Sequence, residues 1–295
     1  MKTLVVGATG QLGRRVCREL VAAGKTVAGM VRSGADEARL EPLLAAGVEL
    51  VEGNLRDAAS LERAFGGMTA VVSTASASLS HQSGDSIQSV DLDGQLRLID
   101  AAKRAGVSRF VYISFSSNMT TDAPLTAAKR SVEQHLQASG IEYAILRCGF
   151  LMEVMVGPLV GFDFANAKAV VYGTGDKGLS LVSMDDVARM VVLCLDRPEA
   201  SNAVIEFGGP EAVTLHEVVR AFEEVSGRPF EVQHVPEEAL VDQWQQAADP
   251  LSKSLSALMI DFAKGDAIEM GPTLERFPIT PTSIREYATK ILSTP

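Results

Sequence analysis

Short apolar runs alternate with amphipathic segments along the first half of the chain, and this alternation predicts the fold. Six runs of mainly apolar residues have the length of buried parallel strands and lie at 4–6, 26–31, 48–52, 70–73, 109–113 and 143–146. Four intervening segments place apolar residues every three to four positions, as amphipathic helices do, at 11–23, 58–65, 86–105 and 126–139. This order predicts an α/β fold with a doubly wound parallel Rossmann-type sheet.

The regular alternation ends near residue 150. Residues 151–168 are apolar without a regular period, and later segments read as a strand, a helix, a strand and then only helices. We expect residues 1–150 and about 169–208 to form the Rossmann domain, which the strand at 169–172 and the helix at 184–195 would rejoin. Residues 151–168 and 210–295 would form a smaller α+β lobe for a substrate or a partner, and a cleft between two such lobes is the default ligand site.

Three glycines, each three residues apart, lie at the first junction between strand and helix, in TLVVGATGQLG. Gly7 would make the sharp turn, Gly10 would let the backbone approach a pyrophosphate, and Gly13 would let the helix pack on the strand. A generic tight turn is the alternative, but the strand before it and the helix after it favour a dinucleotide site. We assign to this site Gly7, Thr9, Gly10, Gln11, Leu12 and Gly13.

The end of the second strand bears on which dinucleotide binds. An NAD site usually places Asp or Glu there for the ribose 2′-hydroxyl, whereas AGMVRSG offers Arg32 and Ser33, which suit a 2′-phosphate. Arg32 could instead be a solvated loop residue. We favour NADP(H) over NAD(H). The ends of the next two strands should also lie beside the cofactor, which adds Asn54, Leu55, Thr74, Ala75 and Ser76.

Composition excludes several other classes of protein. The 295 residues carry a net charge of −10, whereas a nucleic-acid-binding surface would be basic. No apolar run is long enough to span a membrane and no signal peptide precedes the first strand, so we expect a cytoplasmic monomer or homodimer. Three widely spaced cysteines predict neither a disulfide framework nor a metal site, and motifs of zinc proteases and serine hydrolases are missing.

The segment from residue 109 onward carries a specific family resemblance. It reads RFVYISFSSN, then TTDAPLTAAKRSVEQHL and IEYAILRCGFLMEV, and later LVSMDDVA and SIREYA. These motifs, with GATGQLG, resemble the NmrA-like branch of the atypical short-chain dehydrogenase/reductases over essentially the whole chain. Cys148 replaces the proline of that family's Arg-Pro-Gly-Phe element. The resemblance implies a nicotinamide cofactor, with Gly149 and Phe150 among its binding residues.

One position departs from the usual short-chain reductase. Lys129 stands where such enzymes keep a catalytic lysine, but Leu125 occupies the place of the proton-donating tyrosine four residues earlier. Lys129 could bind the nicotinamide ribose and act as the general acid itself, or could bind the cofactor only. It could also be an exposed helix lysine paired with Glu133.

Two further candidates for the chemistry are less specific. Ser114 and Ser116 end the strand at 109–113 and could hydrogen-bond a substrate oxygen or cap the turn. His81, in the polar loop SLSHQSGDS, could donate a proton or be an ordinary solvated histidine.

Two classes of function follow from these residues. The first is an NADP(H)-dependent oxidoreductase that reduces a small apolar or aromatic quinone, enone, carbonyl or benzylic substrate, with residues 149–152, Phe162 and Phe164 lining its pocket. The second is a non-catalytic NADP-sensing regulatory protein, which the missing tyrosine fits. We favour the reductase because Lys129 is retained; the missing tyrosine disfavours a sugar-nucleotide epimerase or dehydratase.

Overall fold

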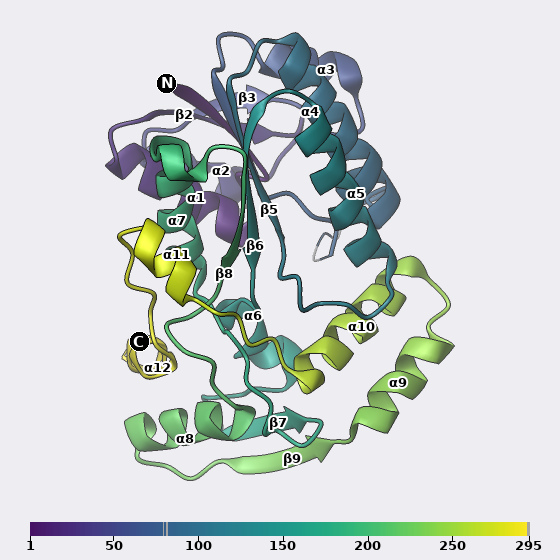
Figure 1. Cartoon of the computed structure of the whole chain (residues 1–295), viewed down its shortest axis with the longest axis vertical. Coiled ribbons are helices and arrows are strands. Elements are labelled where there is room, and N and C mark those ends of the chain that lie inside the picture. Colours follow the sequence, from purple (N-terminus) through teal and green to yellow (C-terminus); the bar gives the residue numbers. More distant parts are fainter. Residues whose placement is uncertain (79, 81, 294–295) are drawn as a thin grey trace. The chain divides into compact units, whose positions relative to one another are not determined.

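The computed structural model describes residues 1–78, 80 and 82–293. Its main element is a seven-stranded sheet with the order β3-β2-β1-β4-β5-β6-β8 (Figure 1). The strands are β1 (Lys2–Val6), β2 (Thr26–Val31), β3 (Glu49–Glu52), β4 (Ala70–Ser73), β5 (Arg109–Phe115), β6 (Glu142–Cys148) and β8 (Ala203–Phe207). The pairings of β3 with β2, β2 with β1, β1 with β4 and β4 with β5 are parallel, so the predicted Rossmann-type sheet is confirmed.

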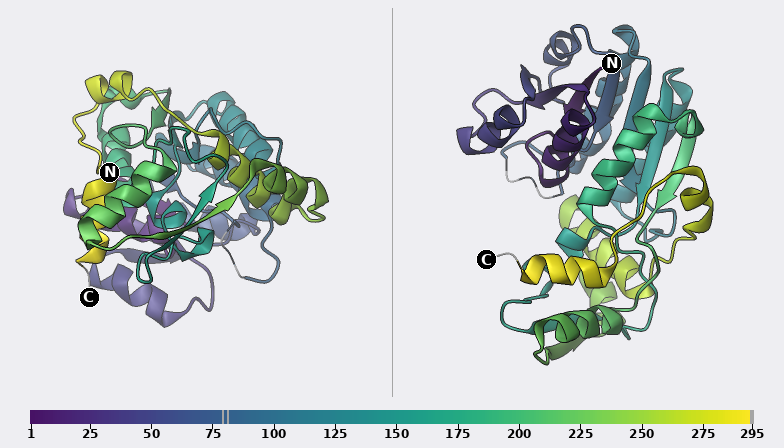
Figure 2. Two further views of the ribbon diagram at one scale, coloured as in Figure 1. Left: turned by 90° about the horizontal axis from the view of Figure 1, so that it is seen from below. Right: turned by 90° about the vertical axis from the view of Figure 1, so that its left-hand side faces the viewer.

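Helices cover both faces of this sheet, as apolar strands without a polar face require. Figures 1 and 2 show α1 (Gln11–Ala22) and α7 (Met184–Asp196) on one face and α3 (Ala58–Ala64), α4 (Asp93–Arg104) and α5 (Pro124–Ala138) on the other. A shorter helix, α2 (Glu37–Ala45), connects β2 to β3. The strand order reverses between β1 and β4, where open sheets of this kind bind their ligands.

The helix expected at 86–105 begins differently from the prediction. Its first turns form a π-helix, η1 (Ile87–Leu92), and α4 continues from it. The spacing of apolar residues cannot distinguish a π-helical turn from an α-helical turn, because both keep the same residues on the buried side of the helix. Single-turn π-segments occur frequently at functional sites.

Residue contacts divide the chain into two compact units. The first comprises Met1–Ser114, Ala127–Leu146 and Val187–Ile205, and the second comprises Phe115–Thr126, Arg147–Asp186 and Glu206–Pro295. One expectation is wrong: β7 (Lys168–Tyr172) does not rejoin the main sheet but pairs in parallel with β9 (Glu231–Val235), in the second unit. A short, mainly apolar strand carries no local signal that identifies its partner strand, and the surrounding segments select that partner.

The second unit has its own apolar core. It contains a short helix, α6 (Met152–Met155), and the helices α8 (Leu215–Ser226), α9 (Glu237–Gln246), α10 (Pro250–Lys264), α11 (Gly271–Arg276) and α12 (Ile284–Leu292). Phe162 packs edge-on against Phe222 at 4.9 Å between ring centroids, and Phe150 against Phe262 at 5.0 Å. Phe150 and Phe162 are therefore core residues in this structure rather than an open pocket wall.

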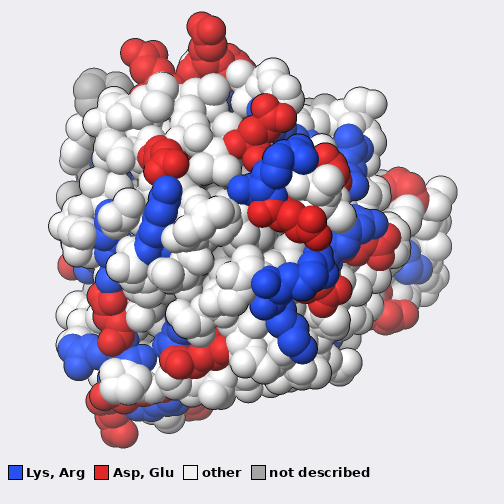
Figure 3. All heavy atoms as spheres, turned by 90° about the horizontal axis from the view of Figure 1, so that it is seen from above, with Lys and Arg blue, Asp and Glu red and all other residues white. Residues whose placement is uncertain are grey.

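No helix among the described residues is both long and apolar enough to cross a bilayer. On the face shown in Figure 3, lysine and arginine side chains lie beside aspartates and glutamates and do not form a separate basic area.

Candidate cofactor and active site

The glycine loop has the close packing that the sequence predicted. Gly7 is left-handed, with φ of 85°, and its carbonyl accepts a hydrogen bond from the Gly10 N–H at 2.9 Å. A Cβ placed on Gly13 would lie 2.1 Å from the Gly7 oxygen, so only glycine lets α1 approach β1 this closely. Gly10 is the N-cap of α1 and offers no side-chain cap, so the first N–H groups of the helix have no side-chain acceptor there.

The structure brings the end of β4 against this loop. The Thr74 N–H and hydroxyl both donate to the Val6 carbonyl, at 2.9 and 3.0 Å. A Cβ on Gly7 would lie 2.8 Å from the Thr74 hydroxyl and 2.9 Å from the Ala75 nitrogen. Residues assigned from separate strand ends thus meet at the reversal point of the sheet, next to the start of α1, where ligands of such sheets bind.

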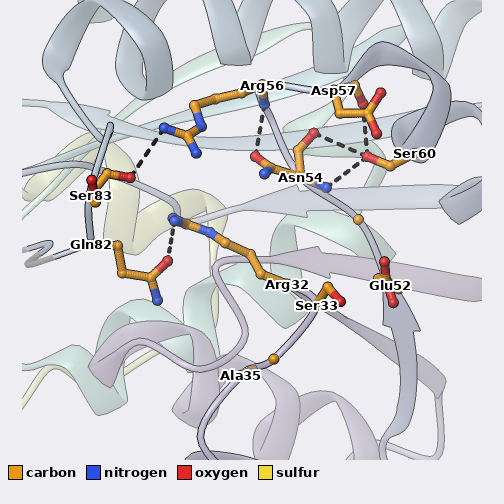
Figure 4. A pocket seen from close by; sticks show the side chains of 12 residues that line it. Arg32, Ser33, Ala35, Glu52, Asn54, Arg56, Asp57, Ser60, Gln82 and Ser83 are labelled. Atoms are coloured by element: carbon orange, nitrogen blue, oxygen red, sulfur yellow. Dashed lines mark hydrogen bonds between the residues drawn. The ribbon is translucent and has the colours of Figure 1, made fainter.

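A pocket of about 460 Å³ lies at the ends of β2 and β3 (Figure 4). The predicted residues Arg32, Ser33 and Asn54 line it. Leu55 does not; its side chain is buried in the core of the first unit, because the chain turns inward after Asn54. Sequence reasoning missed the other lining residues, among them Arg56, Gln82 and Ser83.

Arg32 is held by a carboxylate rather than by solvent. Its Nη1 and Nη2 donate to Asp85 Oδ1 and Oδ2 at 3.0 and 2.8 Å, and Nη1 also donates to Gln82. Burial alone would raise the pKa of Asp85, but hydrogen bonds from Arg32 and Ser80 bring it below its usual range. Arg32 is therefore partly exposed but paired, and its partner Asp85 lies 53 residues away in sequence.

Lys129 is buried on α5, so the interpretation as an exposed lysine is also wrong. Only 5% of the residue is exposed, and its Nζ donates to the Ile113 carbonyl at 3.2 Å. The ammonium lies 5.0 Å from the centre of the Tyr112 ring, an attractive cation–π geometry. Lys129 thus places a positive charge beside β5, the strand next to β4 in the sheet.

The Ser114 hydroxyl has a hydrogen-bond partner that differs from both expected ones, a substrate oxygen and the turn. Its hydroxyl donates to Glu133 Oε1 at 2.5 Å, and the same oxygen accepts from Arg130 at 2.8 Å. Both Ser114 and Glu133 are buried. The hydroxyl is therefore engaged with a helix carboxylate rather than with the turn after β5.

The π-helix positions a second buried carboxylate. Asp91 is fully buried, and its Oδ2 accepts from the Ala77 N–H at 2.9 Å, which holds the segment after β4. Burial raises the pKa of Asp91, and the positive charge of Lys129 is the strongest influence that opposes this rise. The sequence indicated this buried carboxylate only weakly, because Asp91 is a single acidic residue on the apolar side of the segment.

Neither Leu125 nor the nearby Tyr112 has the properties expected of a proton donor. Leu125 is buried, and its backbone N–H donates to the Ser254 hydroxyl at 3.1 Å. The Tyr112 hydroxyl is buried without a hydrogen-bond partner among the described residues. Burial first, then the charges of Asp91 and Glu133, raise the pKa of Tyr112 well above 10, which makes its phenol a poor proton donor. His81 lies outside the described residues.

Ser116, which directly follows β5, belongs to a polar contact within the second unit. Its hydroxyl donates to Asp266 Oδ1 at 2.6 Å, and both residues are buried. Nearby, a Cβ on Gly149 would lie 2.2 Å from the Ser180 carbonyl oxygen, so this glycine allows two chain segments to approach closely. Asp266 Oδ2 has no hydrogen-bond partner among the described residues.

The stability of the protein should depend on the protonation of Asp266. Burial, with the negative charges of Glu206 and Asp261, raises its pKa from 3.8 to about 6. The folded chain then keeps a proton that the unfolded chain releases, so this group costs stability as pH rises through that interval, by up to about 3 kcal/mol. Asparagine does not ionise, so the free energy of unfolding of Asp266→Asn should increase relative to that of wild type as pH rises from about 4 to 7. Urea unfolding at several pH values measures this difference. A difference that does not depend on pH would contradict the assignment.

Comparison with known proteins decides the family. The model of the NmrA-like family matches residues 1–288. The chain belongs to the NmrA-like family. A relative named isoflavone reductase homolog IRL, from Zea mays, is 32% identical across 99% of this chain and 98% of its own. The photosystem II assembly factor Ycf39 of Synechocystis sp. is 28% identical across 97% of this chain and 89% of its own.

Solved structures show the same fold for this NmrA-like protein. An NADPH-dependent quinone oxidoreductase from Escherichia coli, complexed with NADPH, has a TM-score of 0.79 at 23% identity, covering 99% of this chain and 100% of its own. Leucoanthocyanidin reductase from Vitis vinifera, also with NADPH, has a TM-score of 0.80 at 17% identity and covers 99% of both chains. Within the described residues, no group of three or more His, Cys, Asp or Glu side chains could hold a metal ion.

Proposed function

We propose that this NmrA-like protein is an NADPH-dependent reductase of a small quinone, enone or carbonyl compound. The observation that carries the proposal is the buried ammonium of Lys129 beside β5, in the unit that also contains the glycine cradle. A buried charge is costly, and an exposed position on the helix would have avoided that cost. The name of the maize relative, an isoflavone reductase homolog, supports the same class of reaction.

Different residues of the chain would bind the cofactor and transfer the proton. The backbone of the Gly7–Gly13 loop would hold the pyrophosphate, and Arg32, Ser33 and Asn54 would hold the adenosine end. The bound nicotinamide would supply the hydride that adds to the substrate carbon. Lys129 Nζ would then give a proton to the oxygen on which negative charge develops, and water would return the proton to Nζ.

A second function, a cofactor-dependent partner-binding protein, has one specific observation in its favour. The Ycf39 relatives are named as assembly factors, and the substitution of Leu125 for tyrosine is compatible with a protein that does no chemistry. Cofactor binding alone therefore does not separate the two functions. Turnover of a substrate does.

The test is NADPH oxidation by the purified chain against benzoquinones, naphthoquinones, aromatic enones and aromatic ketones. We expect turnover of at least one class, with NADPH bound more tightly than NADH. Tight binding of NADPH with no turnover by any compound in the panel would favour the partner-binding function. Equal affinity for NADPH and NADH would contradict the proposed coenzyme preference.

A further inference from the structure

The charge around the pocket at the ends of β2 and β3 is distributed unevenly. Figure 4 shows the guanidinium groups of Arg32 and Arg56 at one end, beside Gln82 and Ser83, and Glu52 and Asp57 toward the other end. A phosphate monoester carries nearly two negative charges at neutral pH, so it would bind at the end with the two arginines.

Arg32 by itself supplies little net charge to that end. Its guanidinium forms a two-point ion pair with Asp85, whose side chain is only 2% exposed. Removing the arginine from this carboxylate would leave a buried charge without its cation, which is strongly unfavourable. Arg32 is therefore expected to stay paired when a ligand binds and to offer only the N–H groups that Asp85 and Gln82 leave over.

Arg56 reaches the same end of the pocket without an ion pair of its own among the described residues. Its Nη1 donates to the Ser83 carbonyl at 3.3 Å, and it forms no ion pair with any residue that the structure describes. A neutral carbonyl does not balance the positive charge of the guanidinium, and Asp85, which this charge also influences from beyond ion-pair distance, is already paired with Arg32. Arg56 is thus the cation of this pocket whose charge is available to an anionic ligand.

Local contacts hold Arg56 in this position. The Arg56 N–H bonds to Asn54 Oδ1 at 3.0 Å, and the Ser60 hydroxyl accepts from the Asn54 N–H at 2.9 Å, so the turn after β3 is fixed. Gly84 is left-handed, with φ of 80°, and a Cβ there would lie 2.0 Å from Arg56 Nη1. A glycine at this point allows the guanidinium to lie directly against the backbone.

We propose that Arg56 is a specificity-determining residue, the cation that binds the 2′-phosphate of NADPH at this pocket while Arg32 stays paired with Asp85. The inference rests on the proposed NADPH-dependent function. In this proposal Arg56 supplies the positive charge that binds the phosphate monoester on the ribose. Arg32 contributes only N–H groups, because Asp85 balances its charge.

The experiment uses two fragments that differ only in the 2′-phosphate, adenosine 2′,5′-bisphosphate and 5′-AMP. Calorimetry on the whole chain should show that Arg56→Gln weakens binding of the bisphosphate by about 10- to 100-fold, as expected for loss of a charge-assisted hydrogen bond, and leaves 5′-AMP unaffected. The bisphosphate affinity should also fall less steeply with salt in this variant. Arg63→Gln, an exposed arginine of α3 outside the pocket, is the matched control and should bind both fragments as wild type does.

Three results would overturn the proposal, and they differ from one another. If wild type prefers the bisphosphate and Arg56→Gln keeps the full preference, Arg56 is not the determinant, and NADPH-dependent function stands. If Arg56→Gln weakens both fragments equally, the residue supports the pocket rather than the phosphate. If wild type binds the two fragments equally, the NADPH preference of the proposed function is itself wrong. Arg56→Lys, which keeps the charge, should retain part of the preference.

Discussion

Replacing Lys129 with methionine is expected to lower kcat by about 100- to 10,000-fold, the usual contribution of a positioned general acid. Lys129 is the buried cation beside β5, and the nearby phenol of Tyr112 has a pKa raised well above 10. Methionine has a similar length and suits a buried position, so the variant should fold and still bind NADPH. The measurement is NADPH oxidation with the best substrate of the panel, together with the dissociation constant of NADPH.

The control for this variant is Lys103→Met, which changes an exposed lysine at the end of α4 and should leave kcat unchanged. Turnover by Lys129→Met above about a tenth of the wild-type rate would show that the proton comes from another group. Loss of NADPH binding together with turnover would instead assign Lys129 to cofactor binding. Thermal unfolding of both variants shows whether the fold is intact.

Gly13→Ala should have the largest effect on cofactor binding among single-methyl changes. The added Cβ would lie 2.1 Å from the Gly7 oxygen and 2.9 Å from the Ala8 Cα, and both are backbone atoms that cannot rotate away. The start of α1 must therefore move from β1, which opens the cradle. We expect about 1–3 kcal/mol of lost stability, as for other overpacked sites, and NADPH affinity lower by about 100-fold or more.

The matched control is Gly271→Ala at the start of α11, where an added Cβ would meet no atom within 4 Å. This change should leave stability equal or slightly higher, because alanine favours helices over glycine. Urea unfolding and NADPH titration on both variants test the pair. An unchanged NADPH affinity in Gly13→Ala would show that the close contact of α1 with β1 does not shape the cofactor site.

Several features of the site could be predicted because they depend on residues close in sequence. The glycine turn follows from φ of 85° at Gly7 and from the missing Cβ of Gly13, both local requirements. Strand ends collect at one edge of any parallel sheet, so Thr74 and Ala75 could be placed beside Gly7 without knowledge of their contacts.

Other features could not be predicted because they depend on partners far apart in sequence. Asp85 pairs with Arg32 across 53 residues, and nothing in either segment indicates the other. The burial of Lys129 depends on the packing of α5 against β5, whereas helix spacing allowed an exposed side chain equally well. The pairing of β7 with β9, apart from the main sheet, likewise depends on which apolar surfaces of the second unit need to be covered.

The sequence alone therefore determined most of the strands and helices before residue 150, the dinucleotide turn and the family, because apolar period and glycine geometry act over a few residues. Only the tertiary structure decided the charge state of the site. It paired Arg32 with Asp85, left Arg56 without an ion pair among the described residues, and buried Lys129 near Asp91 and Glu133. Electrostatic interactions depend on distance and burial in space, and a linear pattern specifies neither.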